Sequence, residues 1–395
     1  MAPPLPPPPP GSERAARERY LRAHAIDIYD RVTESRRHFV RADELCRRAA
    51  AAFPELLPSD AELAAEAPRL QKDKRGVEID QGLFLSAVLA DPMAGTHLCH
   101  AMLLPLSASQ ARLAEFQRSG ALELGGARIE RQGKAAIVTM TNPRFLNAED
   151  ESTLVPLESA IDLALLDPQT DICVLRGGVV EHPRYAGKRL FGAGINLTHL
   201  YEGKIRYLWY LIRDLGFVNK IYRGIALPEI PPEIGSTEKL WIAAVEGFAI
   251  GGHCQILLTI DYTIAAEDAY LTLPARKEGI IPGAANLRLP RFVGDRIARQ
   301  AILAERRIEC ASPEGRMICD EIVPAHDMDK AIDRAVDRLT GSGVVSAAGN
   351  RRAFRAGEEP LDVFRRYMAV YAREQAHCHF SPALVQNLEK NWKVK

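Results

Sequence analysis

Residues 241–266 read WIAAVEGFAIGGHCQILLTIDYTIAA and combine three patterns in close succession. Strand-forming residues at 241–247 lead into the pair Gly251 and Gly252, an apolar helical pattern follows at 251–260, and a second strand-like run closes the segment. A strand, a helix and a strand in this order predict a β-α-β unit, because the helix carries the chain back so that the two strands can lie parallel.

The two glycines stand where the helix begins. The first N–H groups of a helix have no intrahelical acceptor, and glycine lets a ligand oxygen come close to them. The pair therefore predicts a binding site for a negatively charged oxygen, with tight packing of the helix against the strand as the alternative.

The same alternation continues on both sides of this segment. Residues 122–143 have a period of two and predict two or three short strands. We also expect a helix at about 148–166, a strand at 172–177, a helix at about 198–222, and further strands at 263–266 and 271–273. The sequence thus predicts an α/β fold around a mostly parallel sheet.

Helical patterns flank this α/β core at both ends. Residues 12–119 predict an all-helical N-terminal domain, the core runs from 120 to 325, and residues 326–395 form a C-terminal helical region. The stretch 1–11 is rich in proline, cannot build a core and is expected to be a disordered tail.

The composition argues against several classes of function. Lys plus Arg and Asp plus Glu both number 51, so no net charge favours nucleic acid or an anionic membrane as a partner. No apolar run approaches the ~20 residues of a membrane-spanning helix. Seven cysteines without a Cys-x-x-Cys pair, and an N-terminus without a signal-peptide pattern, favour a reducing cytoplasm. The short clusters 97–100 and 377–379 of His and Cys lack a second paired group, so we expect no metal site.

A second glycine-rich stretch, LFGAGINL, occupies residues 190–197. Gly192, Ala193 and Gly194 let the backbone turn sharply, so that the N–H of Ile195 would point into a site. By itself this stretch favours an ordinary strand-to-helix turn. Together with Gly252 it predicts two facing N–H groups, which would form an oxyanion hole.

Five motifs together resemble the crotonase, or enoyl-CoA hydratase/isomerase, superfamily: TNPRFLNA at 141–148, FGAGINL at 191–197, VEGFAIGGHCQI at 245–256, DYTIAAEDAYLTLP at 261–274 and GIIPGAANLRLPRFVG at 279–294. The resemblance covers about residues 120–325. It implies a crotonase-like ββα superhelix that binds acyl-CoA thioesters and stabilises an enolate. The amides of Ile195 and Gly252 would hold the thioester oxygen.

The chain departs from the enoyl-CoA hydratases at two positions. Those enzymes carry catalytic glutamates where Gln255 and Ala275 stand here. Addition of water needs a carboxylate to activate it, and an amide cannot ionise. The resemblance therefore implies an enolate with a different fate, and Ala275 and Ile280 would form a small apolar wall suited to dioxygen.

The helical N-terminal region and the run RYLWYLIRDLGFVNKIYRGI at 206–225 resemble one branch of the superfamily, the cofactor-independent oxygenases of antibiotic biosynthesis. This implies conversion of (3,5-dihydroxyphenyl)acetyl-CoA and O2 into (3,5-dihydroxyphenyl)glyoxylate and free CoA, with no cofactor and no metal. CoA is then part of the substrate. A crotonase-like thioesterase, decarboxylase or isomerase, and a non-catalytic acyl-CoA-binding protein, stay open as alternatives.

Polar side chains are needed to orient the substrate ring. Glu149, Arg213 and Gln255 are the candidates for this role. A helix-start carboxylate at Glu149 and a solvated helix charge at Arg213 are the alternatives. Glu149 is also the nearest candidate for the α-proton base, although holding a phenol is a different task from removing a proton.

The CoA phosphates need cations, and Arg144, Lys188 and Arg189 lie in segments that touch the nucleotide in crotonase relatives. Each is equally consistent with a surface charge. Relatives commonly form trimers or pairs of trimers, so a homo-oligomer built on the C-terminal helices is expected. Packing of these helices back onto their own core is the alternative.

Overall fold

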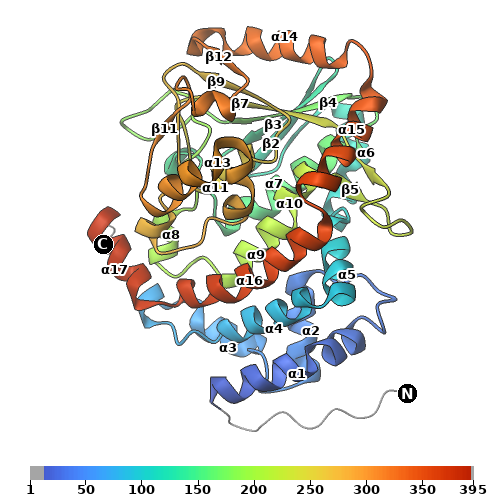
Figure 1. Ribbon diagram of the computed structural model, residues 1–395, viewed down its shortest axis with the longest axis vertical. Helices are drawn as coiled ribbons and strands as arrows, with labels where there is room; N and C mark the ends of the chain where they lie inside the picture. Colours follow the sequence, from blue (N-terminus) through green and yellow to red (C-terminus); the bar gives the residue numbers. More distant parts are fainter. Residues whose placement is uncertain (1–12, 393–395) are drawn as a thin grey trace.

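The computed structural model describes residues 13–392, so the predicted disordered tail at 1–11 lies outside the described residues. The N-terminal part is helical, and its helices are α1 (Arg14–Val32), α2 (Ala42–Ala52), α3 (Asp60–Glu66), α4 (Ile79–Ala90), α5 (Pro92–Leu103) and α6 (Ser107–Ser119). The first strand, β1 (Ala121–Glu123), follows directly (Figure 1).

A mixed sheet of seven strands forms the core. In spatial order its strands are β1, β2 (Ala127–Gln132), β3 (Ala135–Met140), β4 (Ile172–Gly177), β7 (Leu240–Val245), β9 (Tyr262–Ala266) and β12 (Glu321–Val323). The first three pair antiparallel and the remaining pairs are parallel. The predicted α/β fold with a mostly parallel sheet is thus confirmed.

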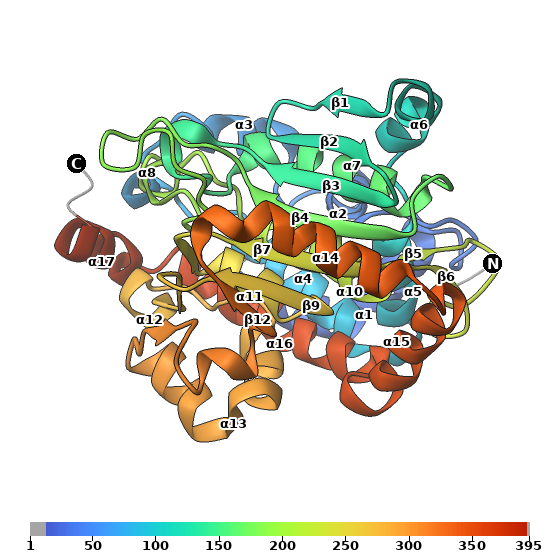
Figure 2. The same ribbon diagram turned by 90° about the horizontal axis from the view of Figure 1, so that it is seen from above.

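Helices cover both faces of the sheet. On one face α14 (Met328–Thr340) packs along β4, β7 and β9, as Figure 2 shows from above. On the other face α7 (Glu151–Leu166) packs on β2 and β3, with α10 (Phe217–Arg223) behind it. Every residue of β3 is buried, as two-sided coverage requires.

Two small sheets extend the core. One has the order β11 (Ile308–Glu309), β10 (Tyr270–Thr272) and β8 (Phe248–Ile250), with β8 and β10 parallel. The other pairs β5 (Ile225–Ala226) with β6 (Ser236–Thr237). From β7 the chain runs through β8 and α11 (Gly252–Leu257) to β9, which pairs parallel with β7, so residues 241–266 have the predicted strand-helix-strand order.

The prediction of a single helix at 198–222 is wrong. The structure has three helices there, α8 (Leu197–Tyr201), α9 (Tyr207–Leu215) and α10. Gly203 has a left-handed φ of 72°, and Gly216 has a non-helical φ of −90° with ψ of −110°. Glycine adopts such conformations at little cost, so the apolar pattern continues while the axis changes direction.

The remaining helices lie in the second half of the chain, and one of them packs on the N-terminal helices. They are α12 (Ala275–Glu278), α13 (Ala285–Leu303), α15 (Val344–Glu358), α16 (Leu361–His379) and α17 (Pro382–Trp392). Figure 1 shows α16 running between the sheet region and α4, and it contacts both α4 and α9. Phe364, Met368 and Tyr371 on α16 are buried against the same chain. These side chains therefore belong to the core of the protomer.

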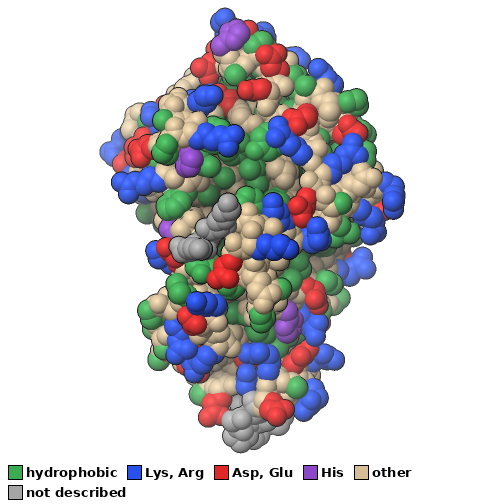
Figure 3. Space-filling model, turned by 90° about the vertical axis from the view of Figure 1, so that its left-hand side faces the viewer, with side chains coloured by type: hydrophobic (Ala, Val, Ile, Leu, Met, Phe, Trp, Pro, Cys, Tyr) green, Lys and Arg blue, Asp and Glu red, His purple; other side chains and the backbone are tan. Residues whose placement is uncertain are grey.

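Basic and acidic side chains are mixed on the face of the molecule that Figure 3 shows. On the face drawn in Figure 3, basic and acidic side chains alternate without a large area of one sign. Within residues 13–392, no helix combines the length and the apolar composition needed to cross a lipid bilayer.

Candidate active site

Two glycine-rich loops face each other next to the small sheet. The backbone of Gly192 pairs with β8, because its N–H donates to the Phe248 carbonyl at 3.1 Å and its carbonyl accepts from Ile250 N–H at 3.0 Å. Gly194 has a φ of 78°, and a side chain there would lie 2.8 Å from the Ile250 carbonyl oxygen. Only glycine fits this approach.

Within residues 13–392, the N–H groups of Ile195 and Gly252 are left without acceptors. Residues 149 and 195 pair as in a parallel sheet, because Glu149 N–H donates to the Gly194 carbonyl at 2.7 Å and Asn196 N–H donates to the Glu149 carbonyl at 2.8 Å. The N–H of Ile195 therefore points away from Glu149. Gly252 is the first residue of α11 and has no intrahelical acceptor. Among the described residues neither N–H donates a hydrogen bond. The loops thus have the arrangement expected of an oxyanion hole.

A narrow cavity begins at these two amides. Residues from α9, α11, α12 and α16 close it, and its lining consists of Ile195, Trp209, Tyr210, Arg213, Asp214, Gly251, Gly252, Gln255, Ala275, Glu278, Ile280, Ile281, Pro282 and Tyr371. The structure therefore brings together six of the predicted site residues, namely Ile195, Gly252, Gln255, Arg213, Ala275 and Ile280.

Arg213 is the centre of a buried polar network. Its Nε donates to Glu149 Oε2 at 2.9 Å, Nη1 donates to Asp214 Oδ1 at 2.9 Å and to Gln255 Oε1 at 3.0 Å, and Nη2 donates to the Gly252 carbonyl at 2.8 Å. Burial alone would lower the pKa of this guanidinium, but the two carboxylates outweigh it and raise the pKa. Through these bonds Arg213, on α9, fixes the position of the Gln255 side chain and of the first turn of α11.

Glu149 lies behind the oxyanion loops. Asp150 caps α7 by accepting from Ser152 N–H at 2.9 Å, which places Glu149 just before the helix and beside Ile195. The Glu149 carboxylate contacts Arg213 and lies beside Gly252, but it is not part of the cavity lining. Its Oε1 atom is buried and has no hydrogen-bond partner among the described residues. Direct contact between Glu149 and a substrate ring stays a prediction.

Gln255 lines the cavity, and one end of its side-chain amide is already bound. Its oxygen already accepts from Arg213, while its nitrogen donates to no group among residues 13–392. A carboxylate at this position would place a third negative charge next to Arg213, beside Glu149 and Asp214. A neutral amide avoids that repulsion and keeps a donor available for an oxygen atom of a ligand.

His253 holds the first oxyanion loop, and the sequence analysis missed this residue. Gly194 N–H donates to His253 Nδ1 at 3.0 Å, so Nδ1 must be unprotonated. Burial lowers the pKa of His253 to about 4, which keeps the ring neutral near pH 7. A side chain at Gly192 would collide with the imidazole ring. The only sequence signal was the position of a histidine directly after the glycine pair.

We expect His253→Phe to lower kcat with little change in KM, because the phenyl ring fills the space but cannot accept the Gly194 hydrogen bond. His253→Asn should retain more activity, since its side-chain oxygen is an acceptor. Steady-state kinetics of both variants check this. Equal losses in both variants would show that packing, and not the acceptor, is what matters.

His253 also has a consequence for stability. A base with a lowered pKa in the folded state contributes stability that is fully present above its ordinary pKa of 6.5 and is lost as the pH falls through about 4. Thermal unfolding of His253→Asn between these values should therefore depend less steeply on pH than that of the unmodified protein.

Glu278 is a second site residue that the sequence analysis missed. It is the last residue of α12, is 3% exposed and lines the cavity. Burial raises the pKa of its carboxyl group from 4.5 to about 7. Its spacing of three residues from Ala275 was a signal available in the sequence, because residues three apart share one face of a helix.

The predicted phosphate-binding cations separate in the structure. Lys188 and Arg189 line a groove of about 430 Å³ together with Tyr185, Phe248 and Tyr270. The side chain of Arg144 is 84% exposed, does not line this groove, and has its Nε 4.0 Å from Glu181 Oε2. Binding of CoA by these three residues stays a prediction.

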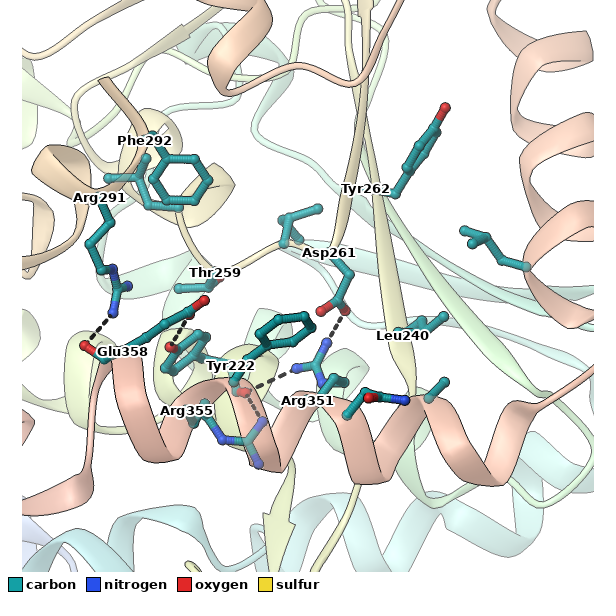
Figure 4. A pocket seen from close by; sticks show the side chains of 16 residues that line it. Tyr222, Leu240, Thr259, Asp261, Tyr262, Arg291, Phe292, Arg351, Arg355 and Glu358 are labelled. Carbon is teal, nitrogen blue, oxygen red and sulfur yellow. Dashed lines mark hydrogen bonds and ion pairs between the residues drawn. The ribbon is translucent and has the colours of Figure 1, made fainter. Parts of the chain in front are cut away.

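A larger cavity, of about 620 Å³, is lined in part by α15 (Figure 4), and its lining includes no residue of the two glycine-rich loops. Its charged groups already have partners: Arg351 pairs with Asp261, Arg355 donates to the Tyr222 carbonyl at 2.9 Å, and Arg291 donates to the Glu358 carbonyl at 3.1 Å. The narrow cavity, in contrast, contains two N–H groups and the Glu278 carboxyl group, none of which has a partner among the described residues. We therefore regard the narrow cavity as the candidate active site despite its smaller size.

Comparison with known proteins identifies the family and the fold of the chain. The enoyl-CoA hydratase/isomerase family model matches residues 130–367. The chain belongs to this family. An enoyl-CoA hydratase from Mycobacterium avium subsp. paratuberculosis K-10 shares the family fold, with a TM-score of 0.56, 20% identity, and coverage of 69% of this chain and 97% of that chain. The resemblance noted in the sequence is thus confirmed.

Two curated members of the family differ in their similarity to this chain. The (3,5-dihydroxyphenyl)acetyl-CoA 1,2-dioxygenase of Amycolatopsis orientalis is 48% identical over 369 residues, covering 92% of this chain and 83% of the relative. The short-chain-enoyl-CoA hydratase of Clostridium acetobutylicum is 27% identical over 238 residues, covering 60% of this chain and 83% of the relative. The similarity to the dioxygenase therefore extends into the helical regions outside the family core.

The described residues contain no cluster of three or more His, Cys, Asp or Glu side chains that could hold a metal ion. All seven cysteines are free, and six of them are buried.

Proposed function

We propose that this family member is a cofactor- and metal-independent dioxygenase that converts (3,5-dihydroxyphenyl)acetyl-CoA and O2 into (3,5-dihydroxyphenyl)glyoxylate and CoA. The observation that carries the proposal is the pair of unpaired N–H groups at Ile195 and Gly252, which open onto a cavity with an amide at Gln255. The 48% identity to the Amycolatopsis orientalis dioxygenase supports the choice of substrate.

The oxyanion hole supplies the first part of the chemistry. A thioester oxygen becomes negative when the α-carbon loses its proton, and two fixed N–H donors stabilise that charge. The α-carbon in this substrate is also benzylic, so the aromatic ring shares the charge. The resulting carbanion is electron-rich enough to transfer an electron to O2.

Bond formation between the α-carbon and oxygen then gives a peroxide. Attack of the peroxide on the thioester carbonyl expels CoA, and cleavage of the O–O bond leaves the keto acid. Both oxygen atoms of O2 enter the product, and the two α-hydrogens leave the carbon as protons, so the reaction balances without another oxidant. The protein contributes placement, exclusion of water and charge stabilisation.

The site residues have complementary parts in this proposal. Gln255 donates its free N–H groups to a phenolic oxygen, and Arg213 holds Gln255 in place. Ala275 and Ile280 form a small apolar wall for O2. Lys188 and Arg189, beside the aromatic groove, bind the CoA phosphates, with Arg144 as an exposed further cation.

An oxygen electrode combined with thiol titration tests the function. The purified protein, treated with a chelator, is mixed with (3,5-dihydroxyphenyl)acetyl-CoA. We expect one O2 consumed for each CoA released. Thiol release without O2 uptake would indicate a thioesterase. The absence of both O2 uptake and thiol release would favour a decarboxylase, an isomerase or a non-catalytic acyl-CoA-binding protein.

We also propose that the protein is a cytoplasmic homo-oligomer. The free cysteines support a reducing compartment. Exposed apolar side chains on the C-terminal helices, with Val345 at 89%, Phe354 at 65% and Val370 at 64% exposure, support a contact between copies. Light scattering after gel filtration measures the mass, and a monomer at micromolar concentration would contradict this expectation.

A further inference from the structure

We propose that Glu278 is the general base that removes the α-proton of the thioester, an assignment that rests on the proposed oxygenase function. In this step the C–H bond breaks, an O–H bond forms on the Glu278 carboxylate, and the electron pair enters the enolate. The enolate oxygen is held by the amides of Ile195 and Gly252. No other reactant is needed.

The position of Glu278 supports this role. Its side chain lines the same cavity as the two oxyanion amides, and it reaches the cavity from α12 on the face that also carries Ala275. The methyl group of Ala275 is small and leaves room beside the carboxyl group. A thioester with its oxygen at the amides would place its α-carbon within this cavity.

In the part of the chain that the structure describes, Glu278 has no partner that explains its burial. It is 3% exposed, and none of the hydrogen bonds and ion pairs found within residues 13–392 involves its carboxyl group. A buried carboxyl group without a partner destabilises the fold, so it calls for an explanation in function. A group that changes protonation near pH 7 is also well matched to proton transfer at that pH.

The other carboxylates of the site are less suited to the role. Glu149 is paired with Arg213 and lies outside the cavity lining. Asp214 lines the cavity but accepts a hydrogen bond from Arg213 Nη1 at 2.9 Å. A carboxylate held by a guanidinium is a weaker base than one without a cation partner. Glu278 has only Lys277 as a charge that lowers its pKa.

Exchange of the α-proton tests the assignment without O2. The protein is incubated anaerobically with (3,5-dihydroxyphenyl)acetyl-CoA in D2O, and deuterium at the α-carbon is followed by mass spectrometry, with the protein-free rate subtracted. Aerobic O2 uptake is measured in parallel. We compare Glu278→Gln, Glu278→Leu and Glu149→Gln. Arg276→Ala is the control, because Arg276 is on the same helix but exposed and paired with Glu305.

We expect both Glu278 variants to lose exchange and O2 uptake together, by about 100- to 10,000-fold, with KM little changed. Neither variant should unfold at a lower temperature than the unmodified protein, since each removes an unpaired buried acid. Arg276→Ala should exchange at the normal rate.

Other outcomes separate this assignment from the proposed function. Normal exchange and normal O2 uptake in Glu278→Gln would overturn the base assignment and leave the oxygenase function standing. If Glu149→Gln lost α-proton exchange and Glu278→Gln retained it, the base would be assigned to Glu149. Exchange that depends on Glu278 without any O2 uptake would support the base and refute the oxygenase.

Discussion

Gly252→Ala is expected to lower kcat by about 100- to 1000-fold, the effect of losing one oxyanion-hole donor. A side chain at this position would collide with Glu149 Oε2 and would lie 2.9 Å from Arg213 Nη2. Both groups are held in the buried network, so the start of α11 must move instead and its N–H turns away from the substrate oxygen. O2 uptake and CoA release under saturating substrate measure the loss.

A second glycine provides the matched control for this variant. Gly349 lies within α15 and has no atom within 4 Å of the position that a side chain would occupy. Gly349→Ala should therefore leave kcat unchanged and leave stability equal or slightly higher, because alanine favours a helix. If Gly252→Ala also retained normal turnover, the oxyanion hole could not be located at Gly252, and a binding role for the protein would gain support.

Arg213→Met is expected to reduce the free energy of unfolding by about 3 to 5 kcal/mol, the cost of leaving buried charges without a partner. The variant retains the length of the side chain but leaves Glu149 and Asp214 side by side in the core. Gln255 would also lose the donor that fixes its oxygen. Urea unfolding at pH 7 measures the stability, and activity should fall with it.

An exposed arginine serves as the control for Arg213→Met. Arg128 forms ion pairs with Glu123 and Glu130 but its side chain is 45% exposed, so Arg128→Met should cost less than about 1 kcal/mol. Adding Glu149→Gln and Asp214→Asn to Arg213→Met should restore part of the lost stability. No recovery would mean that packing of the guanidinium, and not charge compensation, dominates.

The backbone part of the site could be predicted from the sequence. Gly192, Gly194 and Gly252 are needed because loops approach each other closely, and such needs appear as glycine at fixed places in the chain. Ile195 follows directly from its neighbours. The division of residues 198–222 into the three helices α8, α9 and α10 could not be predicted, since the apolar pattern continues through Gly203 and Gly216.

The partners of the side chains were harder to predict. Glu149 and Arg213 were each proposed to orient the substrate ring, and that role stays a prediction. Their contact with each other could not be predicted, because they are 64 positions apart and the contact depends on how α7 and α9 pack. His253 and Glu278 were not predicted, because a single histidine or glutamate on a short helix carries no sequence pattern that marks it as functional. Their importance comes from burial, which changes the pKa of each group.

The sequence by itself identified the family through its five motifs, and it predicted the α/β core and the two glycine-rich loops, because periodicity and glycine placement act locally along the backbone. The tertiary structure decided which polar groups meet, which of them lose contact with water, and which remain without a partner. These properties depend on desolvation and on distances between residues far apart in the chain. For this reason Glu149 lies behind the cavity as the partner of Arg213, whereas Glu278 lies in the cavity with its carboxyl group free.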